Sequence, residues 1–123
     1  MLKTILLVGA GGAVGCVARY LVSVALVSRA IGGLGLGTLT VNILGSMLLG
    51  FLAGWGRQWV IALLAIGFCG GFTTFSTFSL EVFNMLRIGN LKGAALYAVV
   101  SMVVCALAVW AGFSIGMKID RVA

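Results

Sequence analysis

The most informative stretch of this sequence is GFCGGFTTFSTFS, residues 67–79. Two adjacent glycines are followed by five hydroxyl residues in the last seven positions, which is a poor composition for a continuous membrane helix. Gly-Gly and Thr-Thr favour an unwound segment, which a membrane protein tolerates only where the backbone is buried in protein or lines a cavity. Carbonyl groups freed by such a break, one set from each of two chains, could together ligate a small cation. We therefore expect a broken helix beside a functional cavity.

Two phenylalanines in this stretch, Phe75 and Phe78, are three residues apart and share one face of a helix. An aromatic ring is negative on its face and positive at its edge. Turned edge-on, the two rings could contact an anion without offering a competing charge. Ordinary packing in the protein core is the alternative explanation for phenylalanines at this spacing.

The chain on both sides of this stretch is strongly apolar. Of its 123 residues, 63% are hydrophobic and 8% are charged, whereas soluble chains carry about 25% charged residues. Stretches of about 20 mainly apolar residues can cross a bilayer as helices, and four are present, at 4–28, 36–55, 59–86 and 92–117. The sequence predicts one all-α integral membrane domain over residues 1–123, with four transmembrane helices and the third one broken.

The inventory of reactive side chains argues against an enzyme. The chain has no histidine, and its two acidic residues are Glu81 and Asp120, so a Ser-His-Asp or Cys-His site cannot be built within it. Its three cysteines show no CxxC spacing and are expected to pack as small apolar residues. Apart from Arg19, which lies inside the first span, the basic residues behind the net charge of +6 stand near the ends of the spans. We interpret them as topology anchors and not as a nucleic-acid surface.

The basic residues are divided almost evenly between the two sides of the membrane. One side would carry Lys3, Arg57, Lys118 and Arg121, and the other Arg29, Arg87 and Lys92. Because the positive-inside rule needs a clear imbalance to fix an orientation, we expect the same chain to insert both ways. An antiparallel homodimer would then supply the two-fold symmetry that larger transporters encode as inverted repeats.

Neutral polar residues recur every fourth position on two spans. They are Thr38, Asn42 and Ser46 on the second span, and Tyr97, Ser101 and Cys105 on the fourth. Such residues also hold helices together by hydrogen bonds, and that explanation stays open. A row of hydrogen-bond donors without a carboxylate suits an anion better than a cation.

Glycines four residues apart are frequent: Gly11/Gly15, Gly50/Gly54, Gly67/Gly71 and Gly112/Gly116. This spacing leaves a flat surface on one helix face and lets two backbones approach closely. We expect these pairs to pack the helices together and to identify no function.

Three stretches of the chain resemble the Fluc (CrcB-type) family of fluoride channels. They are GAVGCVARY at 12–20, VNILGS at 41–46 and GGFTTFSTFS at 70–79. The third is long and unusual and is therefore the most specific, and together with the four spans the resemblance covers essentially the whole chain. It implies an antiparallel homodimer with two fluoride pathways at the subunit interface.

The resemblance also implies roles for individual residues. The pathway would be lined by Phe75, Phe78, Asn42, Ser76, Thr77, Ser79, Tyr97, Ser101 and Thr38. Arg19 and Glu81 would lie in a vestibule, and the backbone carbonyls of Gly70 and Thr73 from each chain would hold a structural sodium ion. Cys105 departs from the family, in which a hydroxyl is more usual, and a thiol is a weak donor.

The function implied is passive export of cytoplasmic fluoride across the inner membrane by a protein whose partners are fluoride, lipid and a second copy, with no nucleic acid. The alternatives are a small proton-coupled multidrug exporter, which needs a carboxylate at its substrate site, and an accessory membrane subunit. For Arg19, the alternatives to a vestibule role are reaching the membrane interface and pairing with an acid such as Glu81.

Overall fold

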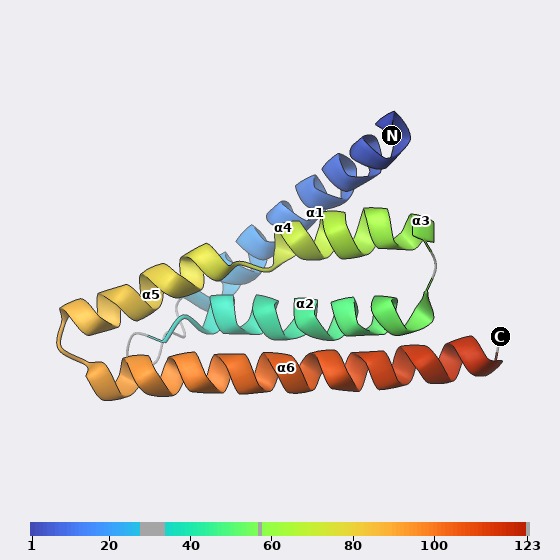
Figure 1. Cartoon of the computed structure of the whole chain (residues 1–123). Coiled ribbons are helices and arrows are strands. Elements are labelled where there is room, and N and C mark those ends of the chain that lie inside the picture. The colour runs from blue at the N-terminus through green and yellow to red at the C-terminus, as the bar shows by residue number, and fades with distance from the viewer. Residues whose placement is uncertain (28–33, 57, 123) are drawn as a thin grey trace.

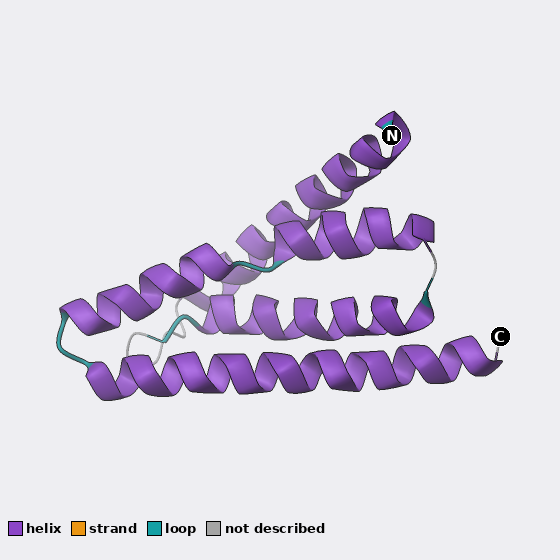
Figure 2. Cartoon of the chain, viewed as in Figure 1, coloured by secondary structure: helices purple, strands orange, loops and turns teal. Residues whose placement is uncertain are grey.

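The structure is a computed structural model that describes residues 1–27, 34–56 and 58–122. Every element in it is a helix (Figures 1 and 2). In chain order they are α1 (Leu2–Leu26), α2 (Leu36–Trp55), the short α3 (Gln58–Val60), the π-helix η2 (Ile61–Cys69), the short α4 (Gly70–Phe72), α5 (Phe75–Arg87) and α6 (Leu91–Val122).

Four segments are long and apolar enough to cross a membrane: Leu2–Leu26, Leu36–Trp55, Ile61–Arg87 and Leu91–Val122. This confirms the all-helical architecture with four candidate spans. The predicted bounds of the second span match those of α2, whereas α6 continues to Val122 because the residues after Met117 include no helix breaker. Arg29 and Arg57, two of the expected topology anchors, lie outside the described residues.

Neighbouring spans alternate in direction (Figure 1). α1 and the third span run one way, α2 and α6 run the other way, and both chain termini lie at the same end of the bundle. α2 packs against α6, and α1 packs against η2 and α4. The assignment of the basic residues to two sides of the membrane assumed this alternation.

The third span changes direction at two residues. Thr73 (φ −82°, ψ 158°) and Thr74 (φ −151°, ψ 114°) are extended between the end of α4 and the start of α5. The expectation that Gly70 and Gly71 would also be unwound is wrong, because both are helical. A Cβ at Gly71 would overlap the carbonyl oxygen of Gly12, so this glycine serves close packing against α1.

The glycine pairs bring helix backbones into direct contact, as predicted. A Cβ at Gly11 would overlap the carbonyl oxygen of Leu63, and one at Gly15 that of Phe68. On the other side of the bundle, the glycines of α2 and α6 face each other's backbones in the same way; they are Gly50, Gly54, Gly112 and Gly116. Small residues at these crossings therefore set the helix separation.

A turn joins α5 to α6 at the predicted position. Gly89 has φ 79°, in the left-handed region that favours glycine. The Oδ1 atom of Asn90 accepts a hydrogen bond of 2.9 Å from the backbone N–H of Gly93 and so caps α6. The sequence Gly-Asn at 89–90 therefore ends one span and begins the next.

Replacing Gly112 with alanine is expected to destabilise the protein by about 1–3 kcal/mol, because the new methyl group would overlap the carbonyl oxygen of Met47. Gly9→Ala is the matched control, since a Cβ at Gly9 meets nothing within 4 Å and alanine favours helix more than glycine does. Thermal unfolding in detergent measures both variants. Equal melting temperatures would show that the α2–α6 crossing is not tightly packed.

Candidate functional site

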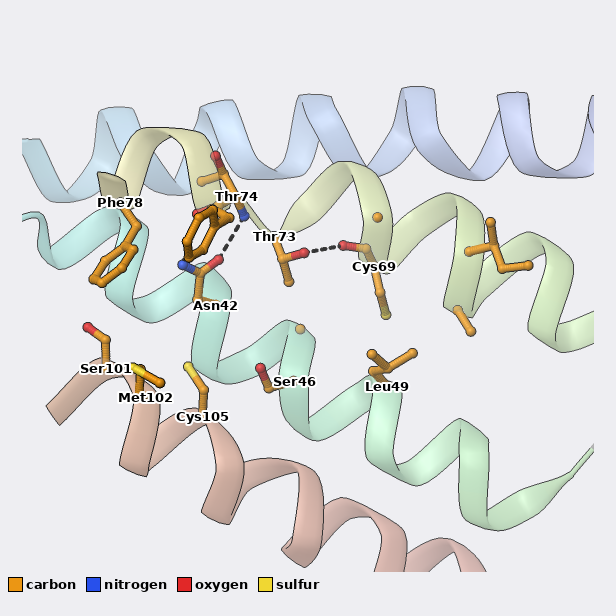
Figure 3. Close-up of a pocket in the computed structure, with 15 residues that line it drawn as sticks. Asn42, Ser46, Leu49, Cys69, Thr73, Thr74, Phe78, Ser101, Met102 and Cys105 are labelled. Carbon is orange, nitrogen blue, oxygen red and sulfur yellow. Dashed lines mark hydrogen bonds between the residues drawn. The ribbon is translucent and has the colours of Figure 1, made fainter. Parts of the chain in front are cut away.

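A pocket of about 440 Å³ lies between α2, the third span and α6. Figure 3 shows the residues around it, with α6 on one side and the helices of the third span on the other. Its polar and aromatic lining comes from Asn42, Ser46, Thr73, Thr74, Phe75, Phe78, Ser101 and Cys105. The two extended residues of the third span, Thr73 and Thr74, therefore lie in the wall of this pocket. We call these two residues the extended step and the pocket the central pocket.

A second pocket of about 220 Å³ is lined from α1, α2 and the third span. Its lining includes Arg19, Cys16, Tyr20, Ser23, Thr38 and Thr77, and we call it the α1 pocket. Thr74 lines both pockets, so the extended step separates them. The α1 pocket combines one cationic side chain with several hydroxyl groups.

Asn42 holds the extended step in place. Its Nδ2 donates to the carbonyl oxygen of Thr74 at 3.1 Å. Its Oδ1 accepts from the backbone N–H of Thr74 at 2.7 Å, as Figure 3 shows. One side-chain amide thus satisfies both backbone groups of a residue that has left the helix. Because an amide carries two hydrogens, the second Nδ2 hydrogen is not needed for this clamp.

The hydroxyl group of Thr74 begins the next helix. Its Oγ1 accepts a hydrogen bond of 3.2 Å from the backbone N–H of Thr77, so Thr74 is the N-cap of α5. The same oxygen lies 3.0 Å from Thr77 Oγ1, to which it donates, and 3.3 Å from Ser76 Oγ. The hydroxyl-rich sequence therefore restarts the helix after the step.

The two carbonyl groups expected to bind sodium belong to Gly70 and Thr73. In a continuous α-helix they would accept from the N–H groups of residues 74 and 77. Here the N–H of Thr74 donates to Asn42 and that of Thr77 to the Thr74 hydroxyl. Both residues line the central pocket. The usual helical donors of these two carbonyls are therefore directed elsewhere, and their role as sodium ligands stays a prediction.

Ser101 presents a buried hydroxyl group to the central pocket. The residue is 7% exposed, and its Oγ has no hydrogen-bond partner within residues 1–27, 34–56 and 58–122. A buried hydroxyl without a partner costs about 1–3 kcal/mol. Figure 3 shows the Ser101 side chain pointing from α6 toward Phe78. Its hydroxyl hydrogen can therefore be donated to a ligand in the central pocket.

Glu81 of α5 lies between α2 and α6. Its Oε1 accepts from Thr38 Oγ1 at 2.7 Å, and its Oε2 accepts from Tyr97 Oη at 2.6 Å. Arg19 instead contacts its own helix: its Nη2 donates a hydrogen bond to Cys16 Sγ, 3.8 Å away. The two charged residues expected in a vestibule therefore have different neighbours, and the alternative of an Arg19–Glu81 pair is not what the structure shows.

Comparison with known proteins gives the family. Residues 6–113 match the family model described as CrcB-like protein, Camphor Resistance (CrcB). The chain belongs to the CrcB-like family. A protein of Geobacter sulfurreducens named "Fluoride-specific ion channel FluC" is 40% identical, over 90% of this chain and 94% of its own length. "Fluoride-specific ion channel FluC 1" of Nitrobacter hamburgensis is 44% identical, over 90% and 93%. The resemblance predicted from the three sequence stretches is confirmed, and the name of these relatives agrees with the prediction that the chain is not an enzyme.

In this CrcB-like protein, the structure brings many of the predicted site residues together. Phe75 and Phe78 are adjacent, with ring centroids 5.7 Å apart, and Phe78 also contacts Tyr97 at 5.3 Å. Ser79, another predicted pathway residue, bonds its own helix: its Oγ donates to the carbonyl oxygen of Phe75 at 2.9 Å. Its hydrogen is therefore used within the helix.

Several residues at the CrcB-like site were not singled out from the sequence. Thr74 lines both pockets, and its signal in the sequence was its place in the Thr-Thr pair. Cys16, Tyr20 and Ser23 join Arg19 in the α1 pocket, and their spacing of three or four residues was visible in the sequence. Met102 lines the central pocket without any polar signal that could have identified it.

Proposed function

We propose that this protein is a fluoride channel that lets cytoplasmic fluoride leave the cell passively through the inner membrane. The observation that carries the proposal is the buried Ser101 hydroxyl, which has no partner among the described residues and lines one pocket with Phe75 and Phe78. A free hydroxyl donor beside aromatic rings, whose edges are positive, is complementary to a small anion. The name of the relatives, fluoride-specific ion channel, supports fluoride as that anion.

Neutral donors can replace the water around fluoride without trapping it. Conduction requires binding that is strong enough to admit the ion and weak enough to release it. In the central pocket, the Ser101 hydroxyl and the second Nδ2 hydrogen of Asn42 would donate to fluoride, while the edges of Phe75 and Phe78 would contact it. Cys105 would mark a weak position, since a thiol donates poorly.

The α1 pocket would be the vestibule of the pathway. Arg19 is half-buried there and can attract anions from solution, and the Thr77 hydroxyl lies in the same pocket. Thr74 lines both pockets. An ion would therefore pass the extended step of the third span on its way between the vestibule and the central pocket.

We propose that two chains pair in antiparallel orientation, with a pathway on each side of the interface. Two features of the single chain support pairing at the step: Phe75 is 79% exposed, and Gly70 is exposed beside the central pocket. Phe75 lines the central pocket, so a second chain that covers its ring would complete the wall of that pocket. The nearly even distribution of basic residues between the two sides of the membrane supports insertion in both directions. Labelling a single introduced cysteine from each side of the membrane would detect only one orientation if this is wrong.

We also propose that a sodium ion holds the two broken helices together at the two-fold axis. Carbonyl oxygens are suitable ligands for this cation, and the usual helical donors of the Gly70 and Thr73 carbonyls are directed elsewhere. The ion would supply positive charge near the pathways. Replacement by a heavier monovalent cation, followed by anomalous scattering, should place a peak between the two chains, and an empty axis would contradict the site.

Purified protein in liposomes should release trapped fluoride when a potassium ionophore removes the electrical limit, with little release of chloride. A fluoride electrode measures the rate, and empty liposomes are the control. A proton-coupled exporter would instead need a proton gradient, and an accessory subunit would leave the fluoride trapped. Either of these results would overturn the proposed function.

A further inference from the structure

The Glu81 carboxylate uses the hydroxyl hydrogens of two predicted pathway residues. Thr38 donates to Oε1 at 2.7 Å and Tyr97 donates to Oε2 at 2.6 Å. A hydroxyl has a single hydrogen, and an ionised carboxylate can only accept. While these bonds exist, neither residue has its hydrogen available for fluoride.

These two hydroxyl groups belong to the proposed pathway on both sides of the extended step. Thr38 is 5% exposed and lines the α1 pocket with Arg19. Tyr97 is 2% exposed, and its ring lies 5.3 Å from that of Phe78, which lines the central pocket. The carboxylate that bridges them is therefore an anion attached to the protein at a place where a diffusing anion would find two convergent donors.

We propose that Glu81 is a tethered competitor of fluoride: its carboxylate occupies the donors of Thr38 and Tyr97, and fluoride takes them by displacing it. This inference rests on the proposed channel function and adds to it a means of release. A bound fluoride that binds tightly to two buried hydroxyls would leave slowly, whereas a carboxylate that reclaims the donors speeds its departure. Glu81 is thus a positioning residue that sets how firmly the pathway holds its ion.

The packing around the carboxylate fits this role. A Cβ at Gly35 would overlap the carboxylate of Glu81, so the group rests directly against the backbone at the start of α2. Tyr97 Oη also lies 3.4 Å from the carbonyl oxygen of Gly35, which gives its hydrogen a second, weaker acceptor. The carboxylate is therefore held in a fitted position by hydrogen bonds that an incoming anion can exchange.

The main test compares Glu81→Gln with wild type by the dependence of fluoride efflux on internal fluoride. Glutamine keeps the shape but removes the negative charge. We expect half-saturating fluoride to fall by about tenfold, as loss of a charged competitor implies, and maximal efflux to fall as well because release slows. Asp120→Asn, which neutralises the other acid of the chain at an exposed position of α6, should change neither quantity. A purely structural role would lower maximal efflux and leave half-saturating fluoride unchanged.

A second measurement works on wild type and does not depend on the folding of a variant. Glu81 is the one glutamate of the chain, so glutamate labelled with ¹³C at its side-chain carboxyl gives an isotope-shifted asymmetric carboxylate band from this residue alone. Fluoride should shift this band as the two hydroxyl bonds are lost, and the shift should be smaller in Tyr97→Phe. An unmoved band, or an unchanged half-saturating concentration in folded Glu81→Gln, would overturn this inference alone. Absence of wild-type efflux would overturn the proposed function first.

Discussion

Replacing Phe75 or Phe78 with isoleucine is expected to reduce fluoride efflux by about tenfold or more while the protein remains folded. Tenfold corresponds to about 1.4 kcal/mol on the barrier. Isoleucine keeps an apolar side chain but has no positive ring edge to offer an anion. The two rings are tilted at 45° with centroids 5.7 Å apart, so the two substitutions change the same part of the pathway. Liposome efflux measured with a fluoride electrode gives the result.

The two variants separate conduction from stability. Phe75 is 79% exposed in the single chain, so its replacement removes little packing there. Phe78 packs in a cluster with Met85 and Tyr97, and its loss should also lower the melting temperature. Phe83→Ile is the matched control, because Phe83 is an exposed residue of the same helix that lines neither pocket described above. Full efflux in both pathway variants would remove the rings from the mechanism.

The spans could be predicted because each depends only on local composition. The bounds of α2 follow from an apolar run that ends at Trp55 before Gly56, whose φ of 73° ends the helix. The extended step was harder to place, since both Gly-Gly and Thr-Thr weaken a helix. Packing against α1 keeps Gly71 helical, whereas Thr74 has a partner in Asn42 and can cap α5.

The partners of the polar residues could not be predicted, because they depend on how the helices are rotated against each other. The residues at 38, 42 and 46 were interpreted as one stripe along α2. In the structure, Thr38 bonds Glu81 and Asn42 bonds Thr74, across 43 and 32 residues of sequence. Spacing alone identified the face of the helix, and only the fold determines which donors remain free.

Asn42→Asp is expected to abolish most fluoride efflux and to lower the melting temperature. An aspartate can still accept from the backbone N–H of Thr74, but it cannot donate to the Thr74 carbonyl oxygen, which lies 3.1 Å from the Asn42 nitrogen. The unpaired carbonyl would cost about 1–3 kcal/mol and would face a carboxylate oxygen of like partial charge. The new negative charge in the central pocket would also repel the anion.

The matched control for this substitution is Asn90→Asp. Asn90 caps α6 through its Oδ1 atom, which accepts from Gly93 N at 2.9 Å, and aspartate caps a helix equally well. Its charge is also favourable at a helix N-terminus, so efflux and melting temperature should match wild type. If Asn42→Asp also conducted and melted like wild type, the bonds between Asn42 and Thr74 would not be needed for stability. Fluoride would then not pass close to residue 42. A normal melting temperature with lost efflux would instead assign the effect to the charge, because the clamp contributes to stability and the charge acts on the passing ion.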